Sequence, residues 1–502
     1  MKEETEVLTE ETAGKTAVET PEKPDEPPEK KQKKQKKPKK KKSRVRRIVG
    51  IVLLVWVVYL IICGTVPPAF QPTADPEDLP VLTGGDPAER VMPIDDNQDA
   101  LVWRLRLIQQ AEKSLDLSYF GFVDDASGRD AMSALLAAGE RGVHIRLLVD
   151  GSNFQLDWST RFRSLAECPN IEVRVYNPIF SNVFLRPWQV NYRMHDKYII
   201  ADGETYILGG RNIRDVSLGY YMEERDQDRD LLVWSPDPGE DSSITDLEEY
   251  FDETWNLSCV SRRNGPLFGA EDALEELRHH YEGLRKTCPA AFEARDMEAC
   301  TMKTNGVVLL GGAPTPDNKK PIVWDSIIKL MSEGQESIIQ TPYLTCNGKM
   351  YDDLIGLHEA GKEVSVVLNS PQTGANVACS VDYFNQKSNL SKLGADLYEC
   401  YGDHSIHTKT ILIDDRISVV GSFNCDMRSV YLDTELMLVV DCPELNQELR
   451  RQVEADMDKS LKILPDGQEI PGPDWNPAEL GLGKKIIYGI LRVLVWPLRQ
   501  LL

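Results

Sequence analysis

The sequence predicts an α/β protein made of two repeated units that share one functional site. Three observations support this prediction. The chain has 502 residues, more than one hydrophobic core usually organises. Apolar patterns typical of helices and strands alternate in the same order in both halves of the chain. A short pattern, His-x-Lys-x4-Asp, occurs once in each half with identical spacing.

The N-terminal region predicts a cytoplasmic tail and a membrane anchor. Residues 1–47 lack apolar periodicity, and Lys30 to Arg47 contains 13 Lys and Arg without an acid, so we expect disorder. Residues 48–66 are 19 uncharged, mainly apolar residues, enough as a helix to cross a hydrocarbon core of about 30 Å. Because Lys and Arg stay in the cytoplasm, we expect a single-pass protein of the cell membrane whose main body is extracytoplasmic. A cleaved signal peptide or a lipoprotein site at Cys63 is the alternative.

The rest of the chain divides into a stalk, two repeats, a connector and a tail. Seven prolines predict an extended stalk after the membrane helix. In both repeats a helix-ending glycine, Gly142 or Gly361, precedes a buried strand. The predicted segments are the stalk at 67–95, the first repeat at 96–258, a polar helical connector at 259–320, the second repeat at 321–458 and the tail at 459–502.

Within the repeats, matching elements are expected in the same order. The first repeat predicts helix 100–114, strand 115–122, helix 128–141 and strand 143–149, and the second predicts helix 324–332, strand 337–343, helix 349–360 and strand 364–368. The connector predicts helices at 270–286 and 290–302.

The C-terminal residues 484–502 predict an amphipathic helix at the membrane surface. Lys485, Arg492 and Arg499 are seven residues apart and therefore share one helical face, with large apolar residues over the rest. A basic helix with Leu and Trp is typical of the membrane interface. Arg492, Pro497 and Arg499 interrupt it too much for a second span, and a helix packed in the core is the alternative.

Composition disfavours a nucleic-acid partner. Residues 48–480 contain 38 basic and 70 acidic side chains, a formal charge of −32. Nucleic-acid binding depends on neutralising phosphates with Lys and Arg, so we expect no such partner. The ten cysteines include no C-x-x-C pair, so no zinc spacing is present, and their pairing stays open.

The repeated pattern points to a site for an anionic ligand. Residues two apart in a strand project from the same face, so the His and Lys of each motif should point into one space. The aspartates fall at hairpin turns, where we expect them to be structural and to hold the hairpin through side-chain-to-backbone bonds. The two copies are His195-x-Lys197-x4-Asp202 and His407-x-Lys409-x4-Asp414.

Each motif is followed by residues suited to binding phosphate. Glycine lets backbone approach a ligand closely, and hydroxyl and amide groups can donate to anionic oxygens. The expected substrate-binding residues are Gly210, Asn212, Ser422 and Asn424.

This duplicated H-x-K-x4-D with its trailing G-[GS]-x-N resembles the phospholipase D superfamily over about residues 100–440. The membrane helix and basic C-terminal helix are further similar to bacterial cardiolipin synthase-like members. The resemblance implies two α/β/α sandwich units with mixed sheets, packed as a pseudo-twofold pair. It implies a phospholipid substrate, no metal and no cofactor. It also implies phosphatidyl transfer through a phosphohistidine to a phosphatidylglycerol hydroxyl, by a monomer with a pseudo-dimeric active site, although the sequence does not fix the oligomeric state.

The same resemblance implies residue roles. His195 would be the nucleophile and His407 the acid/base, although the near symmetry of the motifs allows the reverse. Lys197 and Lys409 would neutralise the phosphate oxygens.

The family also places a carboxylate downstream of each motif to fix the histidine tautomer. Glu435 matches in the second half. In the first half Asp230 is our choice, with Asp228 the competitor.

Two other enzymatic functions remain open, a hydrolytic phospholipase D and a nuclease of the same family. A membrane-tethered binding protein without activity is a third alternative, which two intact motifs disfavour.

Overall fold

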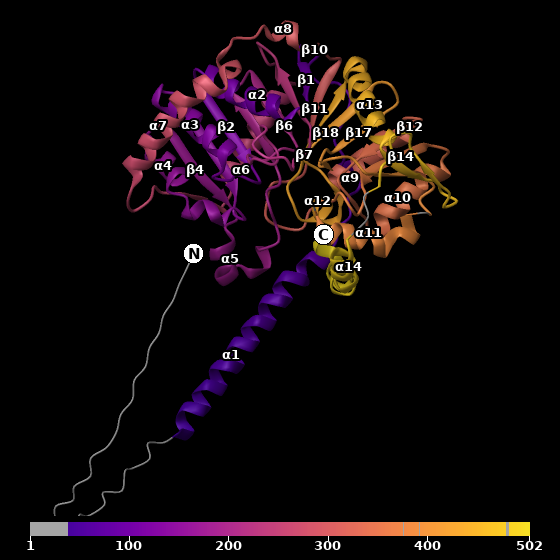
Figure 1. Ribbon diagram of the computed structural model, residues 1–502, viewed down its shortest axis with the longest axis horizontal. Helices are drawn as coiled ribbons and strands as arrows, with labels where there is room; N and C mark the ends of the chain where they lie inside the picture. The colour runs from indigo at the N-terminus through magenta and orange to yellow at the C-terminus, as the bar shows by residue number, and fades with distance from the viewer. Residues whose placement is uncertain (1–38, 375, 391, 478–480) are drawn as a thin grey trace, which may run out of the picture. The chain divides into compact units, whose positions relative to one another are not determined.

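The computed structural model describes residues 39–374, 376–390, 392–477 and 481–502 (Figure 1). The chain divides after Trp56 into two parts, which are described separately. Most of the tail predicted to be disordered lies outside the described residues. Helix α1 (Lys39–Thr65) begins before the expected Ile48, so the basic residues just ahead of the apolar run are helical. Among the described residues, one helical stretch, Arg46–Ala69, is long and apolar enough to cross a membrane.

The part from Val57 onward contains two large mixed sheets. The first has nine strands in the order β10-β1-β8-β6-β5-β2-β3-β4-β9, in which only β2, β3 and β4 are mutually parallel. Its strands are β1 (Arg90–Ile94), β2 (Ser114–Tyr119), β3 (His144–Asp150), β4 (Ile171–Tyr176), β5 (Lys197–Ala201), β6 (Thr205–Gly209), β8 (Asp230–Trp234), β9 (Val260–Arg262) and β10 (Met302–Lys303). The helices of this region are α2 (Asn97–Gln110), α3 (Ala126–Glu140), α4 (Thr160–Ser164), α5 (Ile179–Leu185), α6 (Ser243–Trp255), α7 (Ala270–Thr287) and α8 (Met297–Cys300).

The second sheet repeats this order. It runs β11-β20-β18-β17-β12-β14-β15-β21-β22, and β12, β14 and β15 are its parallel strands. Its strands are β11 (Gly306–Gly311), β12 (Glu336–Gln340), β14 (Glu363–Asn369), β15 (Asp396–Cys400), β17 (Thr410–Ile413), β18 (Ile417–Gly421), β20 (Leu436–Asp441), β21 (Ser460–Ile463) and β22 (Glu469–Pro471). Its helices are α9 (Ile322–Glu333), α10 (Gly348–Glu359), α11 (Val377–Leu390), α12 (Met427–Tyr431), α13 (Pro443–Asp458) and α14 (Leu482–Val495).

Two elements that sequence reasoning missed extend the repeat. Strand β1 lies within the predicted stalk, and strand β11 lies within the predicted connector. β1 pairs antiparallel with β8, and β11 pairs antiparallel with β20. Strand β1 was not predicted because it contains Pro93, and proline is disfavoured in the interior of a sheet. The strand accepts it because β10 pairs only with Arg90 and Val91, so no strand pairs with Pro93 on that side. The predicted helix at 290–302 is also broken, into a short 3-10 turn and α8.

The packing gives each sheet helices on both faces. One core joins the first sheet to α2, α3 and α7, and a second joins the other sheet to α9 and α10. A third core lies between the two sheets and includes Phe251 of α6 and Leu449 of α13. Since α6 contacts β11 and α13 contacts β1, each repeat supplies a helix that packs on the other's sheet. The expected pair of α/β/α sandwiches is therefore confirmed.

Candidate active site

The two histidine motifs enter the molecule along segments that pair with the opposite repeat. Met194 forms a parallel bridge with Thr434, and the His195 amide donates to the Thr434 carbonyl at 3.2 Å. In the same way, β16 (Ser405–Ile406) pairs in parallel with β7 (Asp226–Gln227), and the His407 amide donates to the Gln227 carbonyl at 2.7 Å. These short pairings place each motif beside the acidic residues of the other repeat.

Glu435 of the second repeat contacts His195 of the first. His195 Nδ1 lies 2.9 Å from Glu435 Oε1. The Ser429 hydroxyl donates to the same oxygen at 2.5 Å, and the Ser422 hydroxyl donates to Glu435 Oε2 at 2.5 Å. Since the carboxylate accepts from both serines, it is placed to accept from Nδ1–H as well, which leaves Nε2 of His195 free for chemistry.

Asp228 of the first repeat makes the reciprocal contact with His407. Asp228 Oδ2 lies 2.5 Å from His407 Nδ1. The carboxylate passes so close to Gly210 that a Cβ built there would lie 2.1 Å from Asp228 Oδ1. Glycine at this position is therefore needed for the approach of the carboxylate.

Asp230, our choice from the sequence, does not make this contact. It is fully buried and forms ion pairs with Arg104 at 2.9 Å and Arg211 at 3.1 Å. Sheet register explains the error, because Gly209 pairs with Asp230 where the equivalent Gly421 pairs with Met437. Asp228 is therefore the counterpart of Glu435, and Asp230 is that of Met437.

A local difference between the repeats accounts for the extra acid. Arg211 is buried in the position that Phe423 occupies in the second repeat, and a buried guanidinium needs an anionic partner. Three acids alternate at 226, 228 and 230, so spacing alone did not distinguish them. The shared pattern Asp-x-(Asp/Glu) at 226–228 and 433–435 was the available signal.

Both motif lysines are buried next to their histidines. Lys197 Nζ and Lys409 Nζ each donate to the backbone carbonyl of the histidine two residues earlier. Lys409 Nζ also lies 3.0 Å from His407 Nδ1. The positive charges of both lysines act on the imidazole of His195, as does His407, so the two motifs share one electrostatic environment.

Burial dominates the protonation of this cluster. It lowers the pKa of His195 well below the ordinary value, and the neighbouring lysines add to the effect. Burial and Lys409 also lower the pKa of His407, but Asp228 opposes them. Burial lowers the pKa of Lys197 to about 7, although Glu435 opposes the change. A neutral imidazole at His195 is thus strongly favoured.

The two carboxylates have opposite shifts. Burial alone would raise the pKa of Asp228, but the charges of Lys409 and His407 outweigh it and hold the pKa well below its usual range. Burial raises the pKa of Glu435 well above its ordinary value, against the charge of Lys197. His407 therefore faces the stronger anion. Its side chain is also more open, 20% exposed compared with 11% for His195.

The expected phosphate-binding residues differ in what they leave available. Asn212 accepts from the Gly121 amide at 2.8 Å, which directs its carbonyl away from any ligand. Asn424 Oδ1 is buried without a partner among the described residues, so it is available to a bound molecule. Ser422 instead uses its hydroxyl on Glu435, so it supports the carboxylate rather than facing a phosphate.

The motif aspartates bind backbone, but not that of their own hairpins. Asp202 accepts from the amides of residues 112–114, where β2 starts, and Asp414 accepts from Gln335 and Glu336, where β12 starts. Both have positive φ, 57° and 46°, as their turns require. They tie each hairpin to the neighbouring strand, at the end opposite the histidines.

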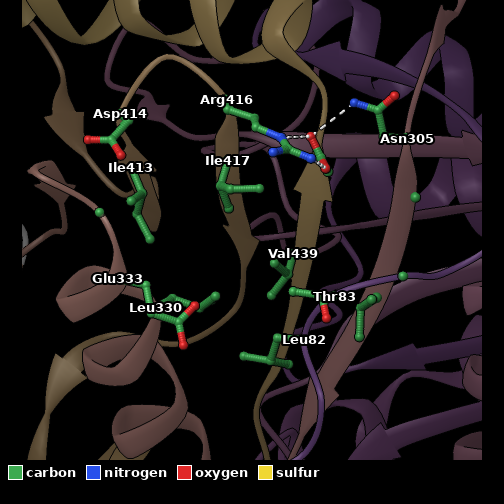
Figure 2. Close-up of a pocket in the computed structure, with 15 residues that line it drawn as sticks. Leu82, Thr83, Asn305, Leu330, Glu333, Ile413, Asp414, Arg416, Ile417 and Val439 are labelled. Atoms are coloured by element: carbon green, nitrogen blue, oxygen red, sulfur yellow. Dashed lines mark hydrogen bonds and ion pairs between the residues drawn. The ribbon is translucent and has the colours of Figure 1, made fainter.

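A separate cavity of about 460 Å³ lies at that opposite end (Figure 2). It includes Asp414 and the ion pair of Arg416 with Asp441, and it contains no motif histidine or lysine. Within the described ranges, no three His, Cys, Asp or Glu side chains gather as metal ligands would. The absence of a metal and of a cofactor stays a prediction.

Comparisons with known proteins agree with this architecture. The family model described as "Cardiolipin synthase, PLD-like domain" matches residues 105–255 and 327–457. Cardiolipin synthase C of Escherichia coli K12 is 28% identical over 421 residues, covering 75% of this chain and 86% of the relative. Cardiolipin synthase 1 of Bacillus cereus is 26% identical, covering 84% of this chain and 73% of the relative.

A solved structure shows the same fold. The crystal structure of phosphatidylserine synthase from Haemophilus influenzae Rd KW20 matches with a TM-score of 0.57 at 18% identity, over 85% of this chain and 98% of the other. The duplicated domain, the two mixed sheets and the paired motifs all agree with the family match. The chain therefore belongs to the cardiolipin synthase group of the phospholipase D superfamily and is an enzyme of the phosphatidyltransferase type.

Proposed function

We propose that this enzyme transfers a phosphatidyl group through a phosphohistidine on His195 to a hydroxyl of phosphatidylglycerol, forming cardiolipin. The observation that carries the proposal is the pair of reciprocal contacts, His195 with Glu435 and His407 with Asp228. Each carboxylate occupies Nδ1 of its histidine. Two Nε2 atoms with different protonation preferences then remain for one phosphorus atom.

In the first step, the Nε2 lone pair of neutral His195 attacks phosphorus and forms the P–N bond. The P–O bond to the leaving alcohol breaks, and protonated His407 gives that oxygen its proton. Lys197 and Lys409 neutralise the phosphoryl oxygens, which lowers the barrier to attack on an anion. A bound phosphodiester also favours the charged form of Lys197, whose pKa in the free protein is about 7.

In the second step, neutral His407 removes the proton from the acceptor hydroxyl. The resulting oxygen attacks phosphorus and the P–N bond breaks, which restores His195 and leaves His407 protonated for the next cycle. Charge is balanced in both steps.

The electrostatic difference between the motifs supports the assignment of roles. His195 must be neutral to attack, and its pKa is lowered the more strongly by burial and both lysines. His407 must alternate between two protonation states, and the Asp228 anion at 2.5 Å supports its charged form. The greater exposure of His407 also suits a group that must meet an incoming alcohol.

We propose further that the enzyme acts on the extracytoplasmic side of the membrane. The basic residues from Lys30 to Arg47 precede the candidate span or lie at its N-terminal end, which favours a cytoplasmic N-terminus. Protease added to intact spheroplasts should then digest the main body and spare an N-terminal tag. Digestion of the tag alone would reverse the topology.

Mass spectrometry of lipid products tests the reaction. Full-length protein in vesicles of phosphatidylglycerol should yield cardiolipin and free glycerol, and His195→Ala should yield neither. Formation of phosphatidic acid without cardiolipin would instead show hydrolysis, which the 20% exposure of the His407 side chain makes the second candidate. DNA cleavage that His195→Ala abolishes would support the nuclease alternative.

A further inference from the structure

Helix α14 docks on the protein through a narrow side that includes Tyr488, with Leu491 and Val495 half-buried. Tyr488 is 5% exposed and donates to the Pro371 carbonyl at 3.2 Å. Arg499, in the 3-10 helix η7 (Trp496–Leu501) that follows α14, donates to Asp382 at 2.6 Å and to the Cys346 carbonyl at 2.9 Å. These polar contacts and the Tyr488–Phe384 ring contact at 6.1 Å hold α14 and η7 against α11, and they cover only a small part of the apolar surface of the helix.

Most large apolar side chains of the same segment consequently face outward. Trp496 is 70% exposed, although it is among the largest apolar side chains in the chain. A contiguous exposed surface of this kind marks a contact with a partner or a membrane. The exposed large apolar residues of the segment are Leu482, Ile486, Ile487, Ile490, Val493, Leu494, Trp496 and Leu498.

A groove of about 560 Å³ lies between α11 and this apolar surface. Its lining residues are Asn385 and Gln386 of α11, Gly489, Arg492 and Val493 of α14, and Trp496 of η7. Arg492 Nε donates to Asn385 Oδ1 at 2.8 Å, and Asn385 Nδ2 donates to the Arg492 carbonyl at 3.1 Å. The terminal nitrogens of Arg492 have no partner among the described residues and are the donors best suited to an anionic oxygen.

Charge and position identify the occupant of this surface as lipid. The α14–η7 segment has no acidic residue, and its exposed cations Lys484, Lys485 and Arg492 suit anionic headgroups. The segment also adjoins the end of the candidate span, because η1 (Pro67–Ala69) lies against η7 and Asn191 donates to the Gly64 carbonyl. An apolar surface beside the residues that end a membrane span is suited to the bilayer interface.

We propose that the α11–α14 groove, called here the headgroup groove, binds the phosphate of an anionic phospholipid while the apolar surface of α14 and η7 enters the same leaflet. Arg492 is the phosphate-binding residue, and Asn385 is a positioning residue that orients its guanidinium. This lipid is bound and not consumed, because the groove has none of the motif histidines or lysines.

Quenching of Trp496 by brominated lipids tests the proposal. Full-length protein with the His195→Ala change is placed in phosphatidylcholine vesicles containing a minor fraction of brominated phosphatidylglycerol or brominated phosphatidylcholine. The contribution of Trp496 is the difference between this protein and its Trp496→Phe variant, since the chain has nine tryptophans. Brominated phosphatidylglycerol should be enriched about fivefold near Trp496, as expected for one basic residue near anionic lipid.

Variants of the groove identify the residue responsible. Arg492→Gln should remove the preference for phosphatidylglycerol and retain quenching by both lipids, while Arg492→Lys should retain part of the preference. Arg451→Gln is the matched control, because this arginine is 67% exposed on α13 and pairs with Glu448. Equal quenching by both lipids, a preference that survives Arg492→Gln, or no quenching of Trp496 would each overturn the proposal. Because His195 is absent throughout, none of these outcomes depends on the transfer reaction.

Discussion

His407 Nδ1 lies 2.5 Å from Asp228 Oδ2, a contact between residues 179 positions apart that belong to different repeats. His195 and Glu435 repeat the relationship in the opposite direction at 2.9 Å. Neither repeat therefore contains a complete histidine–carboxylate pair. The active site exists only where the two repeats meet, which gives a physical reason for both to be held in one chain.

The first prediction separates Asp228 from Asp230. Asp228→Asn removes the anion that orients and charges His407, so kcat should fall by about 10²–10⁴-fold, with a smaller loss of stability than Asp230→Asn because His407 and Lys409 can release their protons. Asp230→Asn leaves buried Arg104 and Arg211 without their shared anion, so it should destabilise the fold by about 3–5 kcal/mol. Paired measurements of kcat and thermal unfolding distinguish the two. Equal loss of stability in both variants would contradict the assignment.

The second prediction concerns the covalent intermediate. A phosphatidyl ester with a good leaving group, such as p-nitrophenol, does not need a proton from His407 to depart. His407→Ala should therefore accumulate a phosphohistidine, because deprotonation of the acceptor becomes slow, whereas His195→Ala should form none. Acid-stable and acid-labile phosphate on the protein is measured after rapid quenching with labelled substrate. Label on His407 in the His195→Ala protein would reverse the two roles.

The third prediction concerns pH. Burial lowers the pKa of Lys197 to about 7, so Lys197 loses its proton as pH rises through neutrality. Burial and Lys409 lower the pKa of His407, so His407 loses its proton at lower pH than an ordinary histidine. Since both are needed charged in the first step, kcat/KM of the free enzyme should decline as His407 deprotonates and fall further above about pH 7.

Two variants assign this alkaline limb. Asp228→Asn removes the anion that raises the pKa of His407, so the fall should begin at lower pH. In Lys197→Arg the new side chain stays charged at all pH values of the assay, so kcat/KM should no longer fall where Lys197 loses its proton. An alkaline limb that neither variant moves would belong to another group.

The fourth prediction concerns the room around Asp228. A Cβ at Gly210 would lie 2.1 Å from Asp228 Oδ1, so Gly210→Ala should displace the carboxylate and reduce kcat by at least tenfold. Gly356→Ala, in helix α10 with no atom within 4 Å of the added carbon, is the control and should retain activity. In the second repeat, Ser422→Gly removes one donor to Glu435 and should cost about 0.5–1.5 kcal/mol in stability. Normal kcat in Gly210→Ala would show that Asp228 does not need its observed position.

The order of residues along the chain was enough to predict the α/β class, the repeat and the motif residues. Apolar periodicity is a local property, so β14 extends the strand predicted at 364–368 by only one residue at each end. The identical spacing of the two motifs was sufficient to bring His195, Lys197, His407 and Lys409 into consideration. Local reasoning failed where a local signal opposed the fold, as at Pro93 in β1.

The pairing of each acid with its histidine could be identified only in the folded chain. Asp226, Asp228 and Asp230 are equivalent in a linear pattern. Which of them contacts His407 depends on the register of β8 against β6 and on buried Arg211, which forms an ion pair with Asp230. The direction of α14 was also undecided, because periodicity defines two faces of a helix but not which face meets the protein. Strand register and helix docking are set by contacts between residues far apart in the chain. The energies of these contacts cannot be inferred from the residues of one local segment.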